Sequence, residues 1–260
     1  MPLFKYCKKE HNIKTSSGIF LGTLDLYKEI ENHEIADTGE GQFFFNIKFE
    51  RNTKIDLDIA NLIFHGVARF GEGKRVFLPG YVNAKVKNIK INKITDEYVE
   101  IECAESEIHR TIQNSFIFCM SDQDEPKKVF DGYDDFWSIP DHKISQFASK
   151  ISRLLIENLE INDIKLQPNS KIIKLRDINI RFEHGRVRYE SRNLVFNDQI
   201  EYNRNRIIDT LTNIPFIKPE KFKNENEYRF VFYVSDHEKY IEPKLKSILL
   251  PNNIFSNIVA

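Results

Sequence analysis

The stretch NENEYRFVFYV, residues 224–234, decides the fold, because it reads as a strand with one charged and one apolar side. Side chains alternate across a β-strand, so Glu225, Glu227 and Arg229 fall on the same side. From residue 228 onward the opposite side carries large aromatic and aliphatic residues, namely Tyr228, Phe230, Phe232 and Val234. The apolar side predicts a strand anchored in a core, and the charged triplet predicts a rigidly held polar site. A simpler interpretation is a salt-bridge ladder at the strand edge, with Arg229 paired to Glu227.

The composition is that of a folded globular protein that is rich in aromatic residues. The 260 residues are 41% hydrophobic and 30% charged, with 21 Phe and 10 Tyr. Thirty-eight basic and 39 acidic residues leave a net charge of −1, so no general field attracts nucleic acid or anionic lipid.

The three cysteines are far apart and form no CxxC pair, which favours a reducing compartment. The first residues lack the apolar core of a signal peptide, and no run approaches the ~18 apolar residues of a membrane span. We therefore expect a cytoplasmic protein with no membrane partner.

The order of elements predicts an α+β fold with mixed, mainly antiparallel sheets, in a single domain over residues 1–260. Predicted strands come in runs rather than in alternation with helices, which argues against a parallel doubly wound sheet. They include residues 3–7, 18–27, 43–49 and 116–120, the last as a central strand because it is apolar on both faces. One long amphipathic helix is predicted over residues 140–159 by apolar residues at a spacing of three and four. Residues 56–66 fit a short helix or a strand, residues 204–211 fit a short helix, and His184-Gly185 fits a hairpin turn.

The common catalytic motifs are missing from this sequence. It contains no GxGxxG after a strand, no GxxxxGK[ST], no HExxH and no GxSxG. The seven histidines lack the i, i+4 pairing of a helical metal site, so no resident metal is expected. The usual nucleotide-binding folds and metalloproteases are therefore not supported.

A second cluster of polar residues is DGYDDFWSIPD, residues 131–141, which holds the only Trp of the chain. It lies between the predicted central strand and the predicted long helix, where binding residues are often carried. Tyr133 is its candidate cofactor-binding residue. The structural interpretation is that Asp141 caps the helix while Phe136 and Trp137 fill the core.

A third cluster lies near the N-terminus and combines basic, aromatic and hydroxyl-bearing side chains. Its members are Lys5, Tyr6, His11, Thr15, Ser16 and Ser17. Hydroxyls and backbone amides on two neighbouring strands can meet phosphate or ribose oxygens, so these residues are candidates for a nucleotide pocket. A solvated turn is the alternative interpretation.

Taken together, these clusters resemble a large bacterial family of uncharacterised proteins that are often associated with phage defence. The shared motifs are a K-Y strand, a GTLDLYKE-like segment, a D-x-x-E-G loop, an F-C-x-S strand, a Y-D-x-[FW] loop and a late K-P-x-x-F-x-x-E-x-E-Y-R-F. They stand here at residues 3–6, 22–29, 37–41, 118–121, 133–137 and 218–230. The resemblance covers the chain from end to end, although each motif is short.

The chain is also distantly similar to the ADP-ribosyltransferase superfamily, which implies a split β-sandwich and a reaction that uses NAD. By that resemblance Glu227 is the catalytic carboxylate at the nicotinamide ribose, and Glu225 orients the acceptor. Lys5 or Tyr6 and Thr15 to Ser17 then flank NAD. Lys5 and Tyr6 stand where many members have Arg or His, and the TSS run differs from the usual Ser-Thr-Ser segment. The implied protein is a toxin or phage-defence effector that modifies a protein or nucleic-acid acceptor.

Two other functions stay open at the level of sequence. One is a non-catalytic sensor or binding protein that acts with a partner protein of a defence system. The other is a Mg²⁺-dependent nuclease that holds the metal on clustered acids, for which the spare carboxylates are Asp37, Glu40, Asp134 and Asp135.

Overall fold

The computed structural model describes residues 1–29, 37–72, 80–123, 132–165, 178–198, 203–236 and 239–259. Its elements form an α+β fold with mostly antiparallel sheets, as the sequence predicted. The chain divides into two compact units, each described by itself below: unit 1 is Met1–Glu40, Gln113–Tyr189 and Lys218–Ala260, and unit 2 is Gly41–Ile112 and Glu190–Ile217. A single domain over residues 1–260 stays a prediction. Within the described ranges, every helix is too short or too polar to cross a bilayer.

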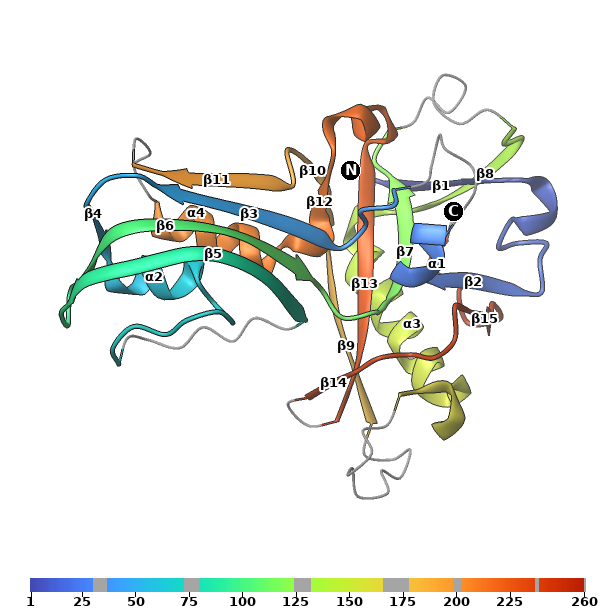
Figure 1. Cartoon of the computed structure of the whole chain (residues 1–260). Coiled ribbons are helices and arrows are strands. Elements are labelled where there is room, and N and C mark those ends of the chain that lie inside the picture. Colours follow the sequence, from blue (N-terminus) through green and yellow to red (C-terminus); the bar gives the residue numbers. More distant parts are fainter. Residues whose placement is uncertain are drawn as a thin grey trace. The chain divides into compact units, whose positions relative to one another are not determined.

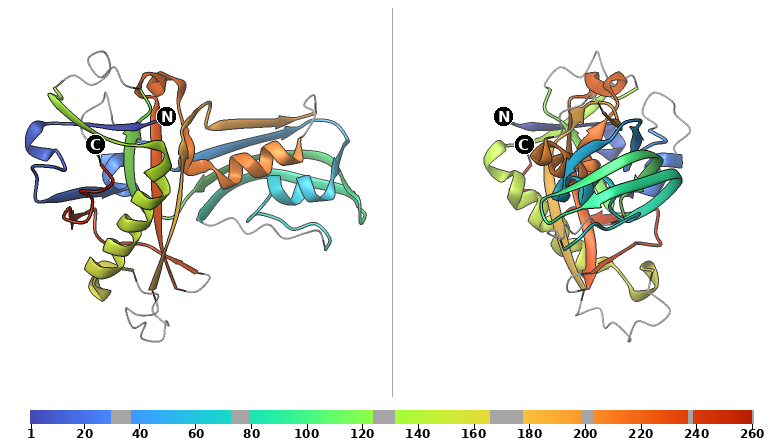
Figure 2. Two further views of the ribbon diagram at one scale, coloured as in Figure 1. Left: turned by 180° about the vertical axis from the view of Figure 1, so that it is seen from behind. Right: turned by 60° about the vertical axis from the view of Figure 1, so that its left-hand side comes forward.

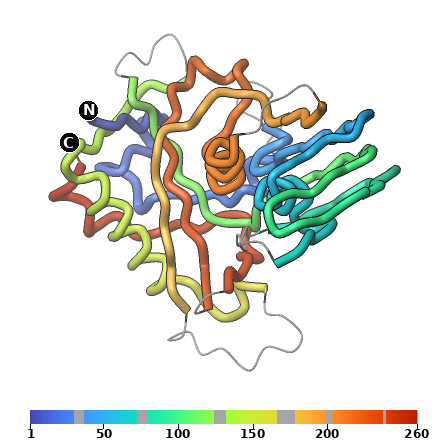
Figure 3. Tube along the Cα trace, turned by 90° about the vertical axis from the view of Figure 1, so that its left-hand side faces the viewer, coloured from blue at the N-terminus to red at the C-terminus, as the bar shows by residue number. Residues whose placement is uncertain are grey.

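Unit 1 is built on one antiparallel sheet of eight strands among its described residues (Figures 1 and 3). The strands are β1 (Leu3–Cys7), β2 (Gly18–Thr23), β7 (Phe116–Ser121), β8 (Asp135–Ile139), β9 (Ile178–Arg186), β13 (Glu227–Asp236), β14 (Lys239–Ile241) and β15 (Ser247–Pro251). The helices of this unit are α1 (Leu24–Glu29) and α3 (Ile144–Asn158), and β10 (Arg188–Tyr189) is a short strand outside the sheet. As predicted, β7 is central, with β13 on one side and β1 and β2 on the other.

The sheet of unit 1 divides at β7, and this division creates the room for a site. On the side of β7 away from β13, β2 pairs with its beginning at Phe116 and Ile117, whereas β1 pairs with its end at Ser121. β8 continues the sheet from β1, and β15 continues it from β2. In the described register, the middle of β7 has no strand partner on this side. The Lys5 side chain occupies the position instead, because its Nζ donates to the carbonyl oxygen of Cys119 at 2.9 Å.

The core of unit 1 forms where α3 packs against the sheet beside β9 (Figure 2). The Phe147 ring of α3 lies 5.5 Å from that of Phe230 and 5.6 Å from that of Phe118. Trp137 is buried in the same core, whereas half of Phe136 is exposed. The apolar side of β13 is therefore covered, and its polar side is left for the site.

Unit 2 contains a five-stranded sheet and two helices among its described residues. Its strands are β3 (Gln42–Phe49), β4 (Thr53–Asp56), β5 (Tyr81–Ile94), β6 (Tyr98–Thr111) and β11 (Asn193–Asn197), and its helices are α2 (Leu57–Ile63) and α4 (Arg204–Thr212). All strand pairs are antiparallel except β11 with β3. Residues 56–66 thus adopt the helical alternative, because the Asp56 side chain caps α2 at the backbone N–H groups of residues 58 and 59. The two helices contact each other.

The structure corrects the predicted strand over residues 18–27. The strand ends at Thr23, and the chain continues as α1 from Leu24. Side chains satisfy the first amides of this helix, because Asn114 Oδ1 accepts from the N–H of Asp25 and Thr23 Oγ1 accepts from the N–H of Leu26. This capping by a residue far along the chain has no local signature in the sequence.

Three further expectations are corrected. His184-Gly185 is not a turn, because β9 pairs continuously with β13 from Ile178 to Arg186. The segment 131–141 is not all loop, since Asp135–Ile139 is β8; Asp131 lies outside the described residues. Asp141 does not cap the long helix: α3 begins at Ile144 after a 3-10 turn, and Asp141 pairs with the N-terminal amine at 3.1 Å. The predicted fold had one long amphipathic helix, whereas α3 is one of four α-helices in the described chain.

Candidate functional site

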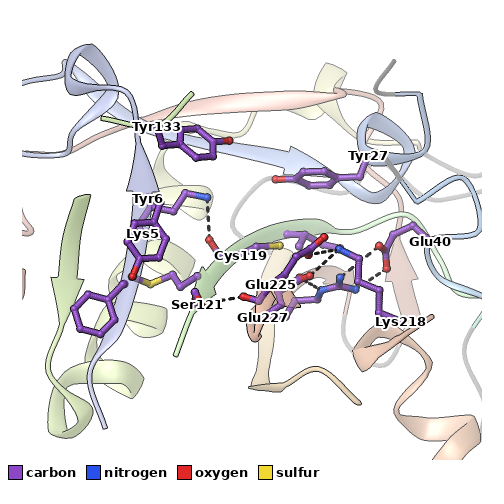
Figure 4. A pocket seen from close by; sticks show the side chains of 14 residues that line it. Lys5, Tyr6, Tyr27, Glu40, Cys119, Ser121, Tyr133, Lys218, Glu225 and Glu227 are labelled. Atoms are coloured by element: carbon purple, nitrogen blue, oxygen red, sulfur yellow. Dashed lines mark hydrogen bonds and ion pairs between the residues drawn. The ribbon is translucent and has the colours of Figure 1, made fainter. Parts of the chain in front are cut away.

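The charged side of β13 forms a buried ion network rather than an exposed ladder (Figure 4). Arg229 is 2% exposed, and its Nε donates to Glu227 Oε1 at 2.7 Å. Its Nη1 donates to Glu40 Oε1 at 2.6 Å. The predicted pairing of Arg229 with Glu227 is therefore confirmed, but both side chains are removed from water, where such a pair has far larger consequences than at a surface.

Lys218 continues this network to the second glutamate of the motif. It is the last residue of β12 (Ile217–Lys218), is 5% exposed, and packs its Nζ 4.5 Å from the centre of the Phe222 ring. Its Nζ donates to Glu225 Oε2 at 2.6 Å and to Glu227 Oε2 at 3.1 Å. One lysine thus bridges the two glutamates that the sequence singled out.

The backbone between these residues differs from the predicted straight strand. Residues Glu220–Glu225 form a 3-10 helix, Asn226 is left-handed with φ 44°, and β13 begins only at Glu227. Asn is one of the few residue types that adopt this conformation readily. Strand alternation therefore does not place Glu225 beside Glu227. The helical turn and the bend at Asn226 do, and the same turn returns Glu225 to Lys218.

The two glutamates have opposite protonation behaviour. Burial by itself raises the pKa of Glu227, but the charges of Arg229 and Lys218 outweigh burial and hold that pKa well below its usual value. Burial raises the pKa of Glu225 to about 7, where Lys218 opposes the shift and the negative charge of Glu227 adds to it. Near neutral pH, Glu227 is ionised and Glu225 stands between its two protonation states. A pair of carboxyl groups separated in this way is typical of acid–base sites.

A cavity of about 120 Å³ lies in front of the two glutamates. Figure 4 shows Tyr27 and Tyr133 across this cavity from Glu225 and Glu227, with Lys5 and Tyr6 of β1 at one end. Its remaining lining residues are Phe4, Glu40, Ile117, Cys119, Met120, Ser121, Lys218 and Arg229. Burial raises the pKa of the Cys119 thiol far above its usual value, which keeps the thiol protonated in the cavity wall.

A larger cavity of about 660 Å³ adjoins the first and shares Lys5, Tyr6, Tyr27 and Tyr133 with it. It lies where β1 and β2 separate from β7, and its other lining residues include Lys8, His11, Ser16 and Ser17. Its volume lies within the range of small-molecule sites. The two cavities together offer an acidic inner end and a polar, partly basic outer end.

Most of the candidate site residues therefore surround the two adjoining cavities. Glu225, Glu227, Lys5, Tyr6 and Tyr133 line the inner cavity, and His11, Ser16 and Ser17 line the outer one together with Lys5, Tyr6 and Tyr133. Thr15 does not line either cavity, because its hydroxyl donates to the carbonyl oxygen of Lys9 at 2.9 Å within the turn.

Three residues of this site make contacts that the sequence does not predict. Lys218 stands in the late K-P-x-x-F motif and Tyr27 in the GTLDLYKE-like segment, and each motif was noted only for its resemblance. Glu40, from the D-x-x-E-G loop, is a predicted candidate metal ligand, whereas the structure places it on Arg229. Motif membership was the available signal, because nothing local predicts these contacts.

The acids considered for a metal-dependent nuclease do not gather. Asp134 accepts from the N–H of Lys9, and Asp135 accepts from Asn12 Nδ2, each at 2.8 Å. Across the described part of the chain, no group of three or more His, Cys, Asp and Glu side chains is arranged to hold a metal ion. The described residues thus provide no ligand set for this alternative.

No protein-family model, curated protein or solved structure matches the chain. The function must therefore be argued from the geometry of the site.

Proposed function

We propose that this protein is an ADP-ribosyltransferase-like effector that transfers ADP-ribose from NAD to an acceptor. The observation that carries the proposal is the pair of glutamates on one cavity wall, with Glu227 ionised and Glu225 titrating near neutral pH. The division of the sheet at β7 and the cavity beside it agree with the split sheet that the resemblance implies. A toxin or phage-defence role is part of the same proposal and rests on the resemblance alone.

The reaction assigns a different task to each glutamate. When the bond between ribose and nicotinamide breaks, its electron pair leaves with nicotinamide and positive charge develops on the ribose carbon. A fixed carboxylate stabilises that charge by the same electrostatic logic as in glycosidases. Glu227 suits this task, because two cations hold it in place and it lines the cavity. Glu225 is the base that accepts the proton which the acceptor loses as it bonds to the ribose carbon, and a pKa near the working pH suits a base.

The residues of the two cavities fit a molecule such as NAD. Glu225 Oε1 is buried and accepts no hydrogen bond from the described residues, so it is available to a donor on a bound molecule. The rings of Tyr27 and Tyr133 offer stacking surfaces for the nicotinamide end (Figure 4). Lys5, Lys8 and the hydroxyls of Ser16 and Ser17 would face phosphate and ribose oxygens in the outer cavity.

The decisive experiment measures nicotinamide release and label transfer from NAD labelled in its adenylate portion, with cell extract as the source of acceptor. We expect Glu227→Gln to reduce both by about 100-fold or more, because removal of one electrostatic contact to the transition state typically costs that much. Glu220→Gln is the matched control, since Glu220 forms an exposed pair with Lys223 in the same 3-10 helix. The proposal fails if wild-type protein releases no nicotinamide, or if Glu227→Gln matches the wild type while remaining folded.

The non-catalytic alternative has one observation in its favour. Glu227 and Arg229 are paired on several atoms, as expected of a structural network that needs no substrate. A sensor or binding protein of a defence system would bind NAD or a partner protein without consuming NAD. Calorimetric binding of NAD with no nicotinamide release in any extract would favour this alternative.

A further inference from the structure

Lys218 binds both glutamates, but Glu225 depends on this positive charge more than Glu227 does. Its Nζ lies 2.6 Å from Glu225 Oε2 and 3.1 Å from Glu227 Oε2. Glu227 has a second cation, Arg229, at 2.7 Å. Among the described residues, Glu225 makes an ion pair with Lys218 alone. Loss of the lysine would therefore leave Glu227 compensated and Glu225 without any cation.

The charges around Glu225 strengthen this dependence. Lys218 approaches from β12, and Glu227 with its partner Arg229 approaches from β13. Two tyrosine hydroxyls stand near the pair: Tyr189 on β10 accepts from the N–H of Glu227 at 2.7 Å, and Tyr133 shares the cavity with Glu225. The other ionisable groups of the cavity wall are Lys5, Tyr6, Tyr27, Glu40 and Cys119. Lys218 compensates the charge of Glu225 while it is shared with Glu227, whose negative charge lies beside it.

The geometry also separates the two oxygens of Glu225. Oε2 is held by Lys218, whereas Oε1 is buried and accepts no hydrogen bond from the described chain. Ser121 Oγ donates to the backbone carbonyl of Glu225 at 2.9 Å and fixes the main chain at this residue. Lys218 thus holds one oxygen, whereas the other lacks a hydrogen-bond donor among the described residues.

We propose that Lys218 is a positioning residue that fixes the Glu225 carboxyl through Oε2, keeps it ionised often enough to act as a base, and presents Oε1 to the group that gives up a proton. As far as catalysis is concerned, this inference rests on the proposed function. Its structural part, the control of Glu225 by Lys218, does not depend on any reaction.

The first test follows Glu225 directly in Lys218→Met by ¹³C NMR of the side-chain carboxyl carbons over a pH series, with Glu225→Gln to assign the signal. Removal of the cation raises the pKa of Glu225 above its wild-type value of about 7. Lys218→Arg should retain a titration close to that of the wild type, because the guanidinium also carries a positive charge. Lys223→Met is the control, because Lys223 is exposed and pairs with Glu220 in the same 3-10 helix.

The second test uses the pH profile of nicotinamide release. In the wild type, activity should rise with pH through about 7 as Glu225 loses its proton. In Lys218→Met this rise moves to higher pH, so activity at pH 7 falls at least about tenfold and partly recovers at pH 9. A purely structural role for Lys218 would lower activity by the same factor at every pH.

The outcomes separate the two proposals. If wild-type protein releases no nicotinamide, the proposed function fails, and the NMR titration still decides the role of Lys218. If Glu225 titrates at the same pH in wild type and Lys218→Met, the inference on Lys218 is overturned whatever the activity. Should Lys218→Met not fold, Lys218→Gln takes its place, because it removes the charge but keeps a hydrogen-bond donor.

Discussion

Two lysine–glutamate pairs of nearly equal length behave in opposite ways in the two units. In unit 2, Lys87 of β5 meets Glu105 of β6 at 2.5 Å, and about half of each side chain is exposed. In unit 1, Lys218 meets Glu225 at 2.6 Å, with side chains 6% and 15% exposed. The hydrogen bond from Lys87 lowers the pKa of Glu105, whereas burial raises the pKa of Glu225 to about 7.

The comparison teaches that distance does not decide what an ion pair does. A charge at a surface keeps most of its hydration, so a partner adds a small attraction. A buried charge loses its hydration, and its partners must compensate that loss. The same residue types therefore form an exposed pair between two paired strands in one unit, and a site with shifted protonation in the other.

Breaking the buried network at its centre should have the largest effect on stability. We expect Arg229→Met to lower the free energy of unfolding by about 3–5 kcal/mol, because Glu227 and Glu40 lose a cation that is 2% exposed. Urea unfolding followed by circular dichroism measures this change. Arg153→Met is the control, since Arg153 forms an exposed i, i+4 pair with Glu157. A loss below about 1 kcal/mol for Arg229→Met would contradict the importance of burial.

The raised pKa of Glu225 predicts a smaller effect that depends on pH. Between its ordinary pKa of 4.5 and about 7, the folded protein holds a proton that the unfolded chain has released. This proton stabilises the fold at low pH, and its contribution disappears as pH rises through 7. The Tm of the wild type should therefore fall more between pH 5 and pH 8 than that of Glu225→Gln, by about 2–4 °C for each kcal/mol involved. Parallel curves for the two proteins would show that Glu225 has an ordinary pKa in the folded state.

The exposed pair of unit 2 predicts the smallest effect. Lys87→Met should leave the free energy of unfolding almost unchanged, because exposed pairs contribute little. Urea unfolding in low and high salt measures this change, and the small difference should vanish in high salt. A destabilisation as large as that of Arg229→Met would mean that β5 and β6 depend on this pair, and the contrast with Lys218 would then be lost.

Much of the fold could be predicted from local patterns. The pattern of apolar and β-forming residues predicted the strands at residues 3–7 and 43–49. The apolar run of residues 116–120 correctly indicated a central strand. Predictions failed where distant residues decide the local structure. Thr23 ends its strand because Asn114 helps to cap α1, and His184 stays extended because β13 pairs with it.

The same distinction between local patterns and contacts of distant residues applies to the site. The sequence by itself determined that β13 has an apolar side, and that Glu227 and Arg229 share the other side, because side chains alternate along any strand. Only the tertiary structure decided that this side is buried, that Glu40 reaches Arg229 from 189 residues away, and that a bend at Asn226 returns Glu225 to Lys218. The pKa of a carboxyl group depends on its burial and on the charges around it, and both are set by residues that meet only when the chain has folded.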